Sequence, residues 1–307
     1  MSVDTNLKTT LEIAGHKLKI SNLSKVFYSA TGFTKGDMLD YYIRIAPLLL
    51  PHLANRPLTM KRYPSGAQGK FFYQKQCPAS HPDWIKTIPV WSGSNKRVIN
   101  FCNAADLPTL VWAINLAALE LHTSLSAAPS LDQPSLLVFD LDPGLPADII
   151  DCARVGLLLK EYFDKHSLQS FPKTSGSKGL QVYVPLNTPI SYDTTKSFAR
   201  VLANRFQEKY PHLIVSNMKK ALRAGKVFID WSQNDSHKTT VCVYSLRAKE
   251  RPTISTPVTW EEVIGVFDQK NSDSLSFEAA QVLDRTDKLG DLFAPVLTLK
   301  QTLPAIK

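Results

Sequence analysis

The stretch LLVFDLDPG, residues 136–144, most constrains the fold of this chain. An apolar run followed at once by the turn residues Pro143 and Gly144 is typical of a buried β-strand. Side chains two positions apart on a strand point to the same face, so Asp140 and Asp142 present their carboxylates side by side where the strand ends. Because a buried carboxylate is costly without a cationic partner, the fold must bring positive charge to this strand.

The rest of the chain alternates irregularly between helical and extended patterns. Thr34 is expected to cap a helix that begins at Lys35, and further helices are expected over residues 108–121, 147–165 and 194–209. Strands are expected over residues 11–20, 57–63, 136–141, 226–231 and 239–246, with a hairpin formed by residues 170–174 and 180–185. The frequent hairpin signals favour a mixed α+β fold with largely antiparallel sheets over a doubly wound fold.

Composition sets the class of protein. With 307 residues, 44% of them hydrophobic, the chain can bury a core of one large domain or two small ones. It has neither a run of about 18 apolar residues nor a signal peptide, so we expect a cytoplasmic protein without a membrane partner. The net charge of +9 suggests a polyanionic partner such as nucleic acid, although such a charge also occurs in proteins that bind no polyanion.

The four cysteines show no spacing that suggests a disulfide framework or a zinc knuckle. The nearest approach to a metal pattern is Cys77 with His81, and two unrelated loop residues explain it better.

A third acid, Asp230, closes another apolar strand, VFID. Three acids at strand ends are the usual protein contribution to a two-metal phosphoryl-transfer site, because Mg²⁺ and Mn²⁺ prefer carboxylate oxygen and keep positions open for phosphate. A structural role is the alternative: Asp142 starts the turn DPG, and Asp140 pairs with an arginine. The acids alone leave both interpretations open.

The segment TSGSKG, residues 174–179, contains small residues that let the backbone approach a ligand. Ser175 and Lys178 could donate to phosphate oxygens. The segment is not a P-loop, and a hairpin turn with a solvated lysine is the alternative.

Basic and aromatic side chains add to this pattern. The cations suited to phosphate are Lys61, Arg62, Arg223 and Arg247, although a surface charge is the simpler interpretation of each one taken alone. The adjacent Phe71 and Phe72 could stack on nucleic-acid bases, or one of them could pack in the core.

Taken in order, these segments resemble the polymerase domain of bacterial ligase D, an end-joining branch of the archaeo-eukaryotic primase superfamily. The matching stretches run nearly end to end: LSKVFYSATGFTKGDMLDYY, RPLTMKRYPSG, FFYQKQCP, AALELH, LLVFDLDPG, FPKTSGSKGLQVYVPL, RAGKVFIDWSQND, KTTVCVYSLRAK and DLFAPVLTLKQ. The resemblance implies one primase-polymerase domain over residues 1–307. Its DNA-end pocket would lie within about residues 1–130, and the catalytic sheet and C-terminal tail within about 131–307. The whole domain would have an RRM-like antiparallel sheet that carries the acids, packed with a second sheet and flanking helices around a central cleft.

The resemblance also implies roles for individual residues. Metal ligands and catalytic acids fall on Asp140, Asp142 and Asp230. Nucleotide-holding residues fall on Lys61, Arg62, His122, Ser175, Lys178, Gln181, Arg223, Gln233 and Arg247. A pocket for the downstream 5′-phosphate falls on Asn22, Lys25 and Lys35, and template stacking on Phe71 and Phe72.

The implied reaction is template-directed transfer of nucleotides that fills short gaps at double-strand breaks. It would use two Mn²⁺ or Mg²⁺ ions, NTP or dNTP substrates with ribonucleotides preferred, and Ku and an ATP-dependent ligase as partners. No KxDG ligase motif occurs, so the sequence fits either a stand-alone polymerase or one domain of a longer chain.

One position departs from the family. Its second motif reads SGxKGLH, with a histidine that contacts the nucleotide phosphates, and this chain has Gln181 there. Glutamine can donate a hydrogen bond but cannot become cationic, so we expect weaker nucleotide binding or an altered pH dependence.

Two other function classes fit part of the pattern. A non-catalytic module that bridges DNA ends is favoured only by Gln181. A HAD-type phosphatase also begins with DxD after an apolar strand, but its second Asp is normally followed by Thr or Val and not by Pro143.

Overall fold

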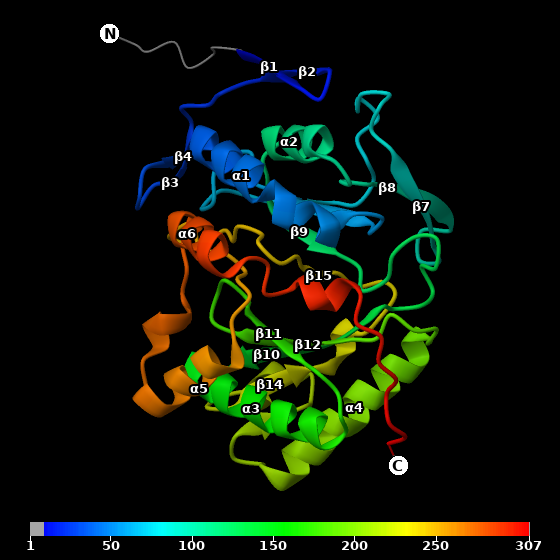
Figure 1. The fold of residues 1–307 in the computed structure, drawn as a ribbon, viewed down its shortest axis with the longest axis vertical. Coiled ribbons are helices and arrows are strands. Elements are labelled where there is room, and N and C mark those ends of the chain that lie inside the picture. The colour runs from blue at the N-terminus through cyan, green and yellow to red at the C-terminus, as the bar shows by residue number, and fades with distance from the viewer. Residues whose placement is uncertain (1–8, 307) are drawn as a thin grey trace.

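The computed structural model describes residues 9–306, which form two large β-sheets and two two-stranded ones, with helices packed around the large sheets (Figure 1). In that view the N-terminal segments lie in the upper part and the sheet that contains β10 lies in the lower part. The expectation of mixed α+β structure with mostly antiparallel pairing is confirmed.

The lower sheet carries the acidic strand at its centre. Its strand order is β11–β12–β10–β14–β13. Its strands are β10 (Leu136–Pro143), β11 (Phe171–Thr174), β12 (Leu180–Pro185), β13 (Ile214–Val215) and β14 (Val227–Asp230). All neighbours pair antiparallel except β13 and β14, and the predicted hairpin is the β11–β12 pair. The acids therefore sit on two central strands that α3 (Ile149–Lys165) and α4 (Tyr192–Lys209) contact.

The upper sheet has the order β15–β9–β5–β8–β7, with β6 paired to β5. Its strands are β5 (Leu58–Arg62), β6 (Phe72–Gln74), β7 (Thr87–Ser92), β8 (Arg97–Cys102), β9 (Ala118–Thr123) and β15 (Thr240–Val241). The strands predicted over residues 226–231 and 239–246 thus belong to different sheets, β14 to the lower and β15 to the upper one. The polar segment between them crosses from one sheet to the other. The second of these strands is also much shorter than predicted.

The helix expected over residues 108–121 is wrong in its second half. Helix α2 (Leu107–Asn115) ends early, Ala117 adopts a positive φ of 63°, and the chain continues as β9. All of the residues on β9 except His122 are buried, and pairing with β5 satisfies their backbone groups. Apolar residues at consecutive positions do not distinguish a buried strand from a buried helix.

Helix α1 (Lys35–Leu53) begins where the sequence predicts. Thr34 caps it, with a reciprocal hydrogen bond to the side chain of Asp37, in a capping box. The segment expected as one strand over residues 11–20 is instead a hairpin of β1 (Thr9–Ile13) and β2 (His16–Ile20), which turns at Ala14 and Gly15, both with positive φ.

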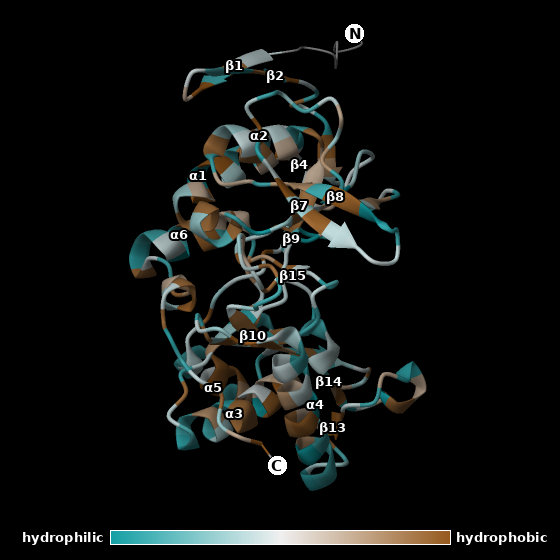
Figure 2. Cartoon of the chain, turned by 90° about the vertical axis from the view of Figure 1, so that its right-hand side faces the viewer, coloured by the Kyte–Doolittle hydropathy of each residue, from teal (hydrophilic) through white to brown (hydrophobic). Residues whose placement is uncertain are grey.

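Two hydrophobic cores stabilise the molecule, one against each sheet. Figure 2 shows hydrophobic segments in the helices and strands of both halves. The upper core also takes residues from α6 (Ala279–Leu289) and from Phe293, whereas α5 (Trp260–Gln269) packs against α3 in the lower one. The division of the domain near residue 130 stays a prediction. Among the described residues no helix is long and apolar enough to cross a membrane.

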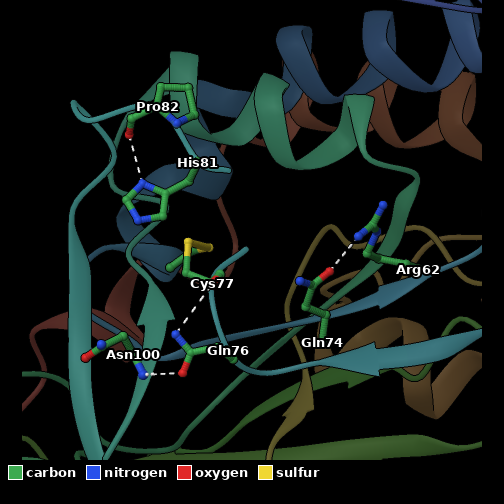
Figure 3. Close-up of a disulfide and its surroundings, with 8 residues drawn as sticks. Arg62, Gln74, Gln76, Cys77, His81, Pro82 and Asn100 are labelled. Carbon is green, nitrogen blue, oxygen red and sulfur yellow. Dashed lines mark hydrogen bonds between the residues drawn. A yellow bond between two sulfur atoms is a disulfide. The ribbon is translucent and has the colours of Figure 1, made fainter. Parts of the chain in front are cut away.

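The cysteine spacing gave no signal for a disulfide, but Cys77 and Cys102 are bonded (Figure 3). Their Cα atoms lie 5.1 Å apart, and the backbone N–H of Cys77 donates to the carbonyl of Asn100 at 2.7 Å. The loop after β6 and the end of β8 meet only in the folded sheet, so the 25-residue spacing gave no signal. The pairing of Cys77 with His81 in a metal site is excluded, and His81 instead contacts the carbonyl of Pro82.

Candidate active site

A single row of side chains crosses the lower sheet. The β-ladder places Asp140 directly opposite Asp230 on one side and Gln181 on the other. Gln181 donates from Nε2 to Oδ1 of Asp140 at 3.0 Å. Asp142 lies two residues further along β10 and is more exposed than Asp140. The antiparallel register, rather than proximity in sequence, therefore brings the three predicted acids together.

The acids repel one another. Burial and the neighbouring charge of Asp142 raise the pKa of Asp140 to about 7. Burial and the charge of Asp230 likewise raise the pKa of Asp142, although Arg223 and Lys178 oppose that shift. The protein therefore does not fully balance the negative charge at this edge. Carboxylate oxygens in such a place are the ligands that a hard divalent cation prefers.

Both carboxylate oxygens of Asp230 are already engaged in hydrogen bonds. Its Oδ1 accepts from the backbone and hydroxyl of Ser232, and its Oδ2 accepts from Nε2 of Gln233 at 2.9 Å. Across residues 9–306 no three acidic, histidine or cysteine side chains are already arranged around one point for a metal. To join Asp140 and Asp142 in holding a cation, Asp230 would have to exchange these partners.

The TSGSKG turn is built around Ser175. The Ser175 hydroxyl accepts from the backbone of Ser177 and of Gly179, and Arg247 donates to the Ser175 carbonyl. A Cβ on Gly179 would lie 2.3 Å from the Leu141 carbonyl, so only glycine lets the turn pack this closely against β10. This packing holds the turn beside the acids.

Sequence reasoning missed Glu120, which organises the basic side of the site. Glu120 is only 2% exposed on β9, within the stretch AALELH. Its carboxylate lies 2.9 Å from Nε2 of His122, 3.4 Å from Nζ of Lys61 and 3.4 Å from Nε of Arg247. Burial alone would raise the pKa of Glu120, but the His122 hydrogen bond and these cations bring it well below its usual value. Reading AALELH as a strand would have placed Glu120 and His122 on one face.

A cavity of about 570 Å³ lies between the two large sheets, next to Asp140 and His122. The predicted residues that line it are His122, Asp140, Asp142, Ser175, Lys178, Gln181, Gln233 and Arg247. Tyr73, Lys75, His237 and Lys238 also line it and were not predicted. Lys61, Arg223 and Asp230 are not among the residues that line this cavity. The Arg223 guanidinium lies over the ring of Phe228, 3.6 Å from its centre. Asp140, Asp142 and the TSGSKG turn line the cavity from the lower sheet, and Tyr73 and His122 line it from the upper sheet. Arg247 contacts both sides, through the Ser175 carbonyl and Glu120.

A second pocket of about 200 Å³ gathers the residues predicted for the 5′-phosphate. Asn22, Lys25 and Lys35 line it together, and Arg62, expected at the nucleotide, lies here instead. Lys35 donates to the carbonyl of Ser21 and to Asn115, each at 2.7 Å. Burial, and then the charge of Lys25, lower the pKa of Lys35 to about 8.

The two phenylalanines lie outside the core. Phe71 is 50% exposed and Phe72 is 45% exposed, at the start of β6. Nζ of Lys61 lies 4.3 Å from the centre of the Phe71 ring, and the Arg62 guanidinium lies 5.1 Å from that of Phe72. Arg62 also donates to Oε1 of Gln74 at 2.6 Å, as Figure 3 shows. Each exposed ring is thus held by a cation.

A family model and a solved structure both match this chain to the polymerase domain of LigD. The family model of the LigD primase-polymerase domain matches residues 34–293. The polymerase domain of Mycobacterium tuberculosis ligase D, solved in complex with DNA, is 36% identical, with a TM-score of 0.84, and the match covers 92% of this chain and 99% of that chain. These matches confirm the primase-polymerase fold.

Sequence relatives agree. The multifunctional non-homologous end joining protein LigD of Mycolicibacterium smegmatis is 38% identical over 282 residues, 91% of this chain and 36% of that protein. The bifunctional LigD of Bacillus subtilis is 32% identical over 275 residues, 89% of this chain and 43% of that protein. This chain therefore spans well under half the length of these relatives. It belongs to the family of LigD primase-polymerase domains, which are nucleotidyltransferases. The HAD-type alternative has no support in this fold.

Proposed function

We propose that this chain is a template-directed polymerase that fills short gaps at DNA double-strand breaks during non-homologous end joining. The observation that carries the proposal is that Asp140 and Asp142 line a cavity together with Lys178 and Arg247, and that Asp230 lies opposite Asp140 on the neighbouring strand β14. Family membership makes nucleotidyl transfer the reaction that this arrangement serves.

Asp140, Asp142 and Asp230 are the residues that would hold two Mn²⁺ or Mg²⁺ ions. Such ions, when bound, lower the pKa of a primer 3′-hydroxyl and stabilise charge on the phosphates. The protein contributes orientation, since Gln181 fixes one oxygen of Asp140. Ser232 and Gln233 keep Asp230 in place until it is needed.

The triphosphate would bind beside the acids, between the TSGSKG turn and Arg247. Lys178 and Arg247 supply positive charge there, and the backbone turn at Ser175 lets phosphate approach closely. The Glu120 carboxylate keeps Arg247 and Lys61 in position between turnovers. A preference for ribonucleotides rests on the family resemblance.

DNA would bind through two further features. The pocket of Asn22, Lys25 and Lys35 has the cationic and amide donors that a downstream 5′-phosphate requires, and Arg62 adds a further cation at its wall. The exposed Phe71 and Phe72 offer rings for stacking on the template. Ku and an ATP-dependent ligase, in the cytoplasm, are the partners that the resemblance implies.

Primer extension on a gapped duplex tests the proposal. The assay compares ribo- with deoxynucleotides, and a downstream strand with and without its 5′-phosphate, in the presence of Mn²⁺. Wild type should extend the primer, Asp140→Asn should not, and Asp132→Asn, an exposed acid on a turn, should match wild type. Equal extension by wild type and Asp140→Asn would refute the assignment of the acids.

The same assay separates the second candidate function. Because Gln181 replaces the family histidine, a module that bridges ends without chemistry would bind 5′-phosphorylated ends and add no nucleotide. In both functions Lys35→Met should weaken the response to the 5′-phosphate, whereas Lys17→Met, on the exposed face of β2, should not.

A further inference from the structure

Lys173 is a buried cation that the proposed reaction does not use. It lies on β11, is 1% exposed, and is absent from the lining of the main cavity. Burial lowers its pKa to about 7. A lysine is costly to bury unless its three donors are satisfied. Nζ of Lys173 satisfies them with Oε1 of Gln181 at 2.5 Å, Oγ of Ser255 at 2.6 Å and the carbonyl of Val241 at 3.1 Å.

The sheet register makes Lys173 the end of the row that contains the acids. Lys173 pairs with Gln181 across β11 and β12, Gln181 pairs with Asp140 across β12 and β10, and Asp140 pairs with Asp230 across β10 and β14. Residues directly opposite on neighbouring strands share a face and contact one another. One continuous row therefore runs from a buried cation through an amide to two carboxylates.

Hydrogen-bond chemistry fixes the direction of the amide at both ends. The Ser255 hydroxyl donates to the Thr174 carbonyl, so toward Lys173 it acts as an acceptor, as the Val241 carbonyl does. The third N–H of the ammonium thus points at Gln181, whose Oε1 must receive it. The carboxylate of Asp140 accepts as well, so it requires the N–H end of the same amide.

We propose that Lys173 is a positioning residue for Gln181: its ammonium holds the amide in the one orientation that donates to Oδ1 of Asp140. The proposal rests on the proposed function only in placing Asp140 at the reacting centre. Lys173 and Gln181 would then act together, because without the Lys173 ammonium the Gln181 side chain could turn its carbonyl toward the Asp140 carboxylate. Outer residues that orient a metal-binding carboxylate typically contribute about 10- to 100-fold to affinity or activity.

The first test does not depend on activity. In ¹⁵N-labelled protein the side-chain NH₂ of Gln181, assigned by its loss in Gln181→Met, should include a proton that exchanges slowly with water, because it donates to Asp140. Lys173→Met should speed that exchange and shift the signal. Lys35→Met, which removes another buried lysine at the second pocket, should change neither. Exchange in the wild-type protein as fast as that of an exposed glutamine amide would overturn the proposal, whether or not any variant folds.

The second test is a double-mutant cycle on primer extension. Lys173→Met should lower kcat/KM about tenfold in the wild-type background and less than about twofold in the Gln181→Met background, since coupled residues are not additive. Losses that simply multiply would show that Lys173 acts independently of Gln181. If the wild-type protein extends no primer, the proposed function fails, while the amide signals still decide the role of Lys173.

Discussion

Replacing Glu120 with glutamine should destabilise the protein and loosen its phosphate-binding wall. The substitution keeps the shape of the side chain and removes the negative charge shared by Lys61, His122 and Arg247. Removing one partner from a buried ionic network typically costs about 3–5 kcal/mol, since it leaves uncompensated charge. Lys61 and Arg247 are partly exposed and can turn toward water, so we expect the lower end, about 3 kcal/mol.

Urea denaturation of wild type and Glu120→Gln measures this free energy of unfolding. Glu262→Gln is the matched control: Glu262 pairs with Arg285 near the surface, and glutamine preserves its helix cap. The control should lose about 1 kcal/mol or less. A loss of that size for Glu120→Gln as well would refute the idea that Glu120 holds Lys61, His122 and Arg247 in place.

The pH dependence gives a further check. The pKa of Glu120 is lowered from its usual 4.5 in the folded protein. Its contribution to stability is therefore fully present above pH 4.5 and is lost as the pH falls toward the folded pKa. The difference in unfolding free energy between wild type and Glu120→Gln should stay constant from pH 7 to about pH 5 and shrink in more acidic solution. A difference that grows on acidification would contradict the assignment.

Three other outcomes are expected. Because burial lowers the pKa of Lys35 to about 8, the gain in extension from a downstream 5′-phosphate should shrink between pH 7 and pH 9; a constant gain would exclude Lys35 as its ligand. Gly179→Ala, whose Cβ would meet the Leu141 carbonyl at 2.3 Å, should lower the unfolding free energy by more than about 2 kcal/mol. Gly265→Ala, in open space on α5, should raise it by about 0.5–1 kcal/mol, and a similar loss in both would contradict the steric argument. Gln181→His should not increase extension, because the imidazole would face the ammonium of Lys173; a sharp increase would show that the glutamine is a handicap.

Local signals predicted several elements correctly. Thr34 and Asp37 marked the start of α1, because a capping box satisfies backbone donors within four residues. The turn TSGSKG marked the β11–β12 hairpin for a similarly local reason. Where the sequence lacked a local signal, prediction failed: the buried apolar run before His122 read as helix, and the disulfide between Cys77 and Cys102 depended on strands that meet only in the folded sheet.

The sequence by itself determined the chemistry available to this protein: two aspartates on one strand, a third closing another, a small-residue turn with a lysine, and a glutamine where the family has histidine. Residue types and period-2 spacing suffice for that, because both are local. Only the tertiary structure decided that Lys173, Gln181, Asp140 and Asp230 form one row. It also decided that Glu120 holds the cations and that Arg62 lies at the second pocket. These depend on strand register and on the packing of two sheets, which are set by contacts between residues far apart in the chain.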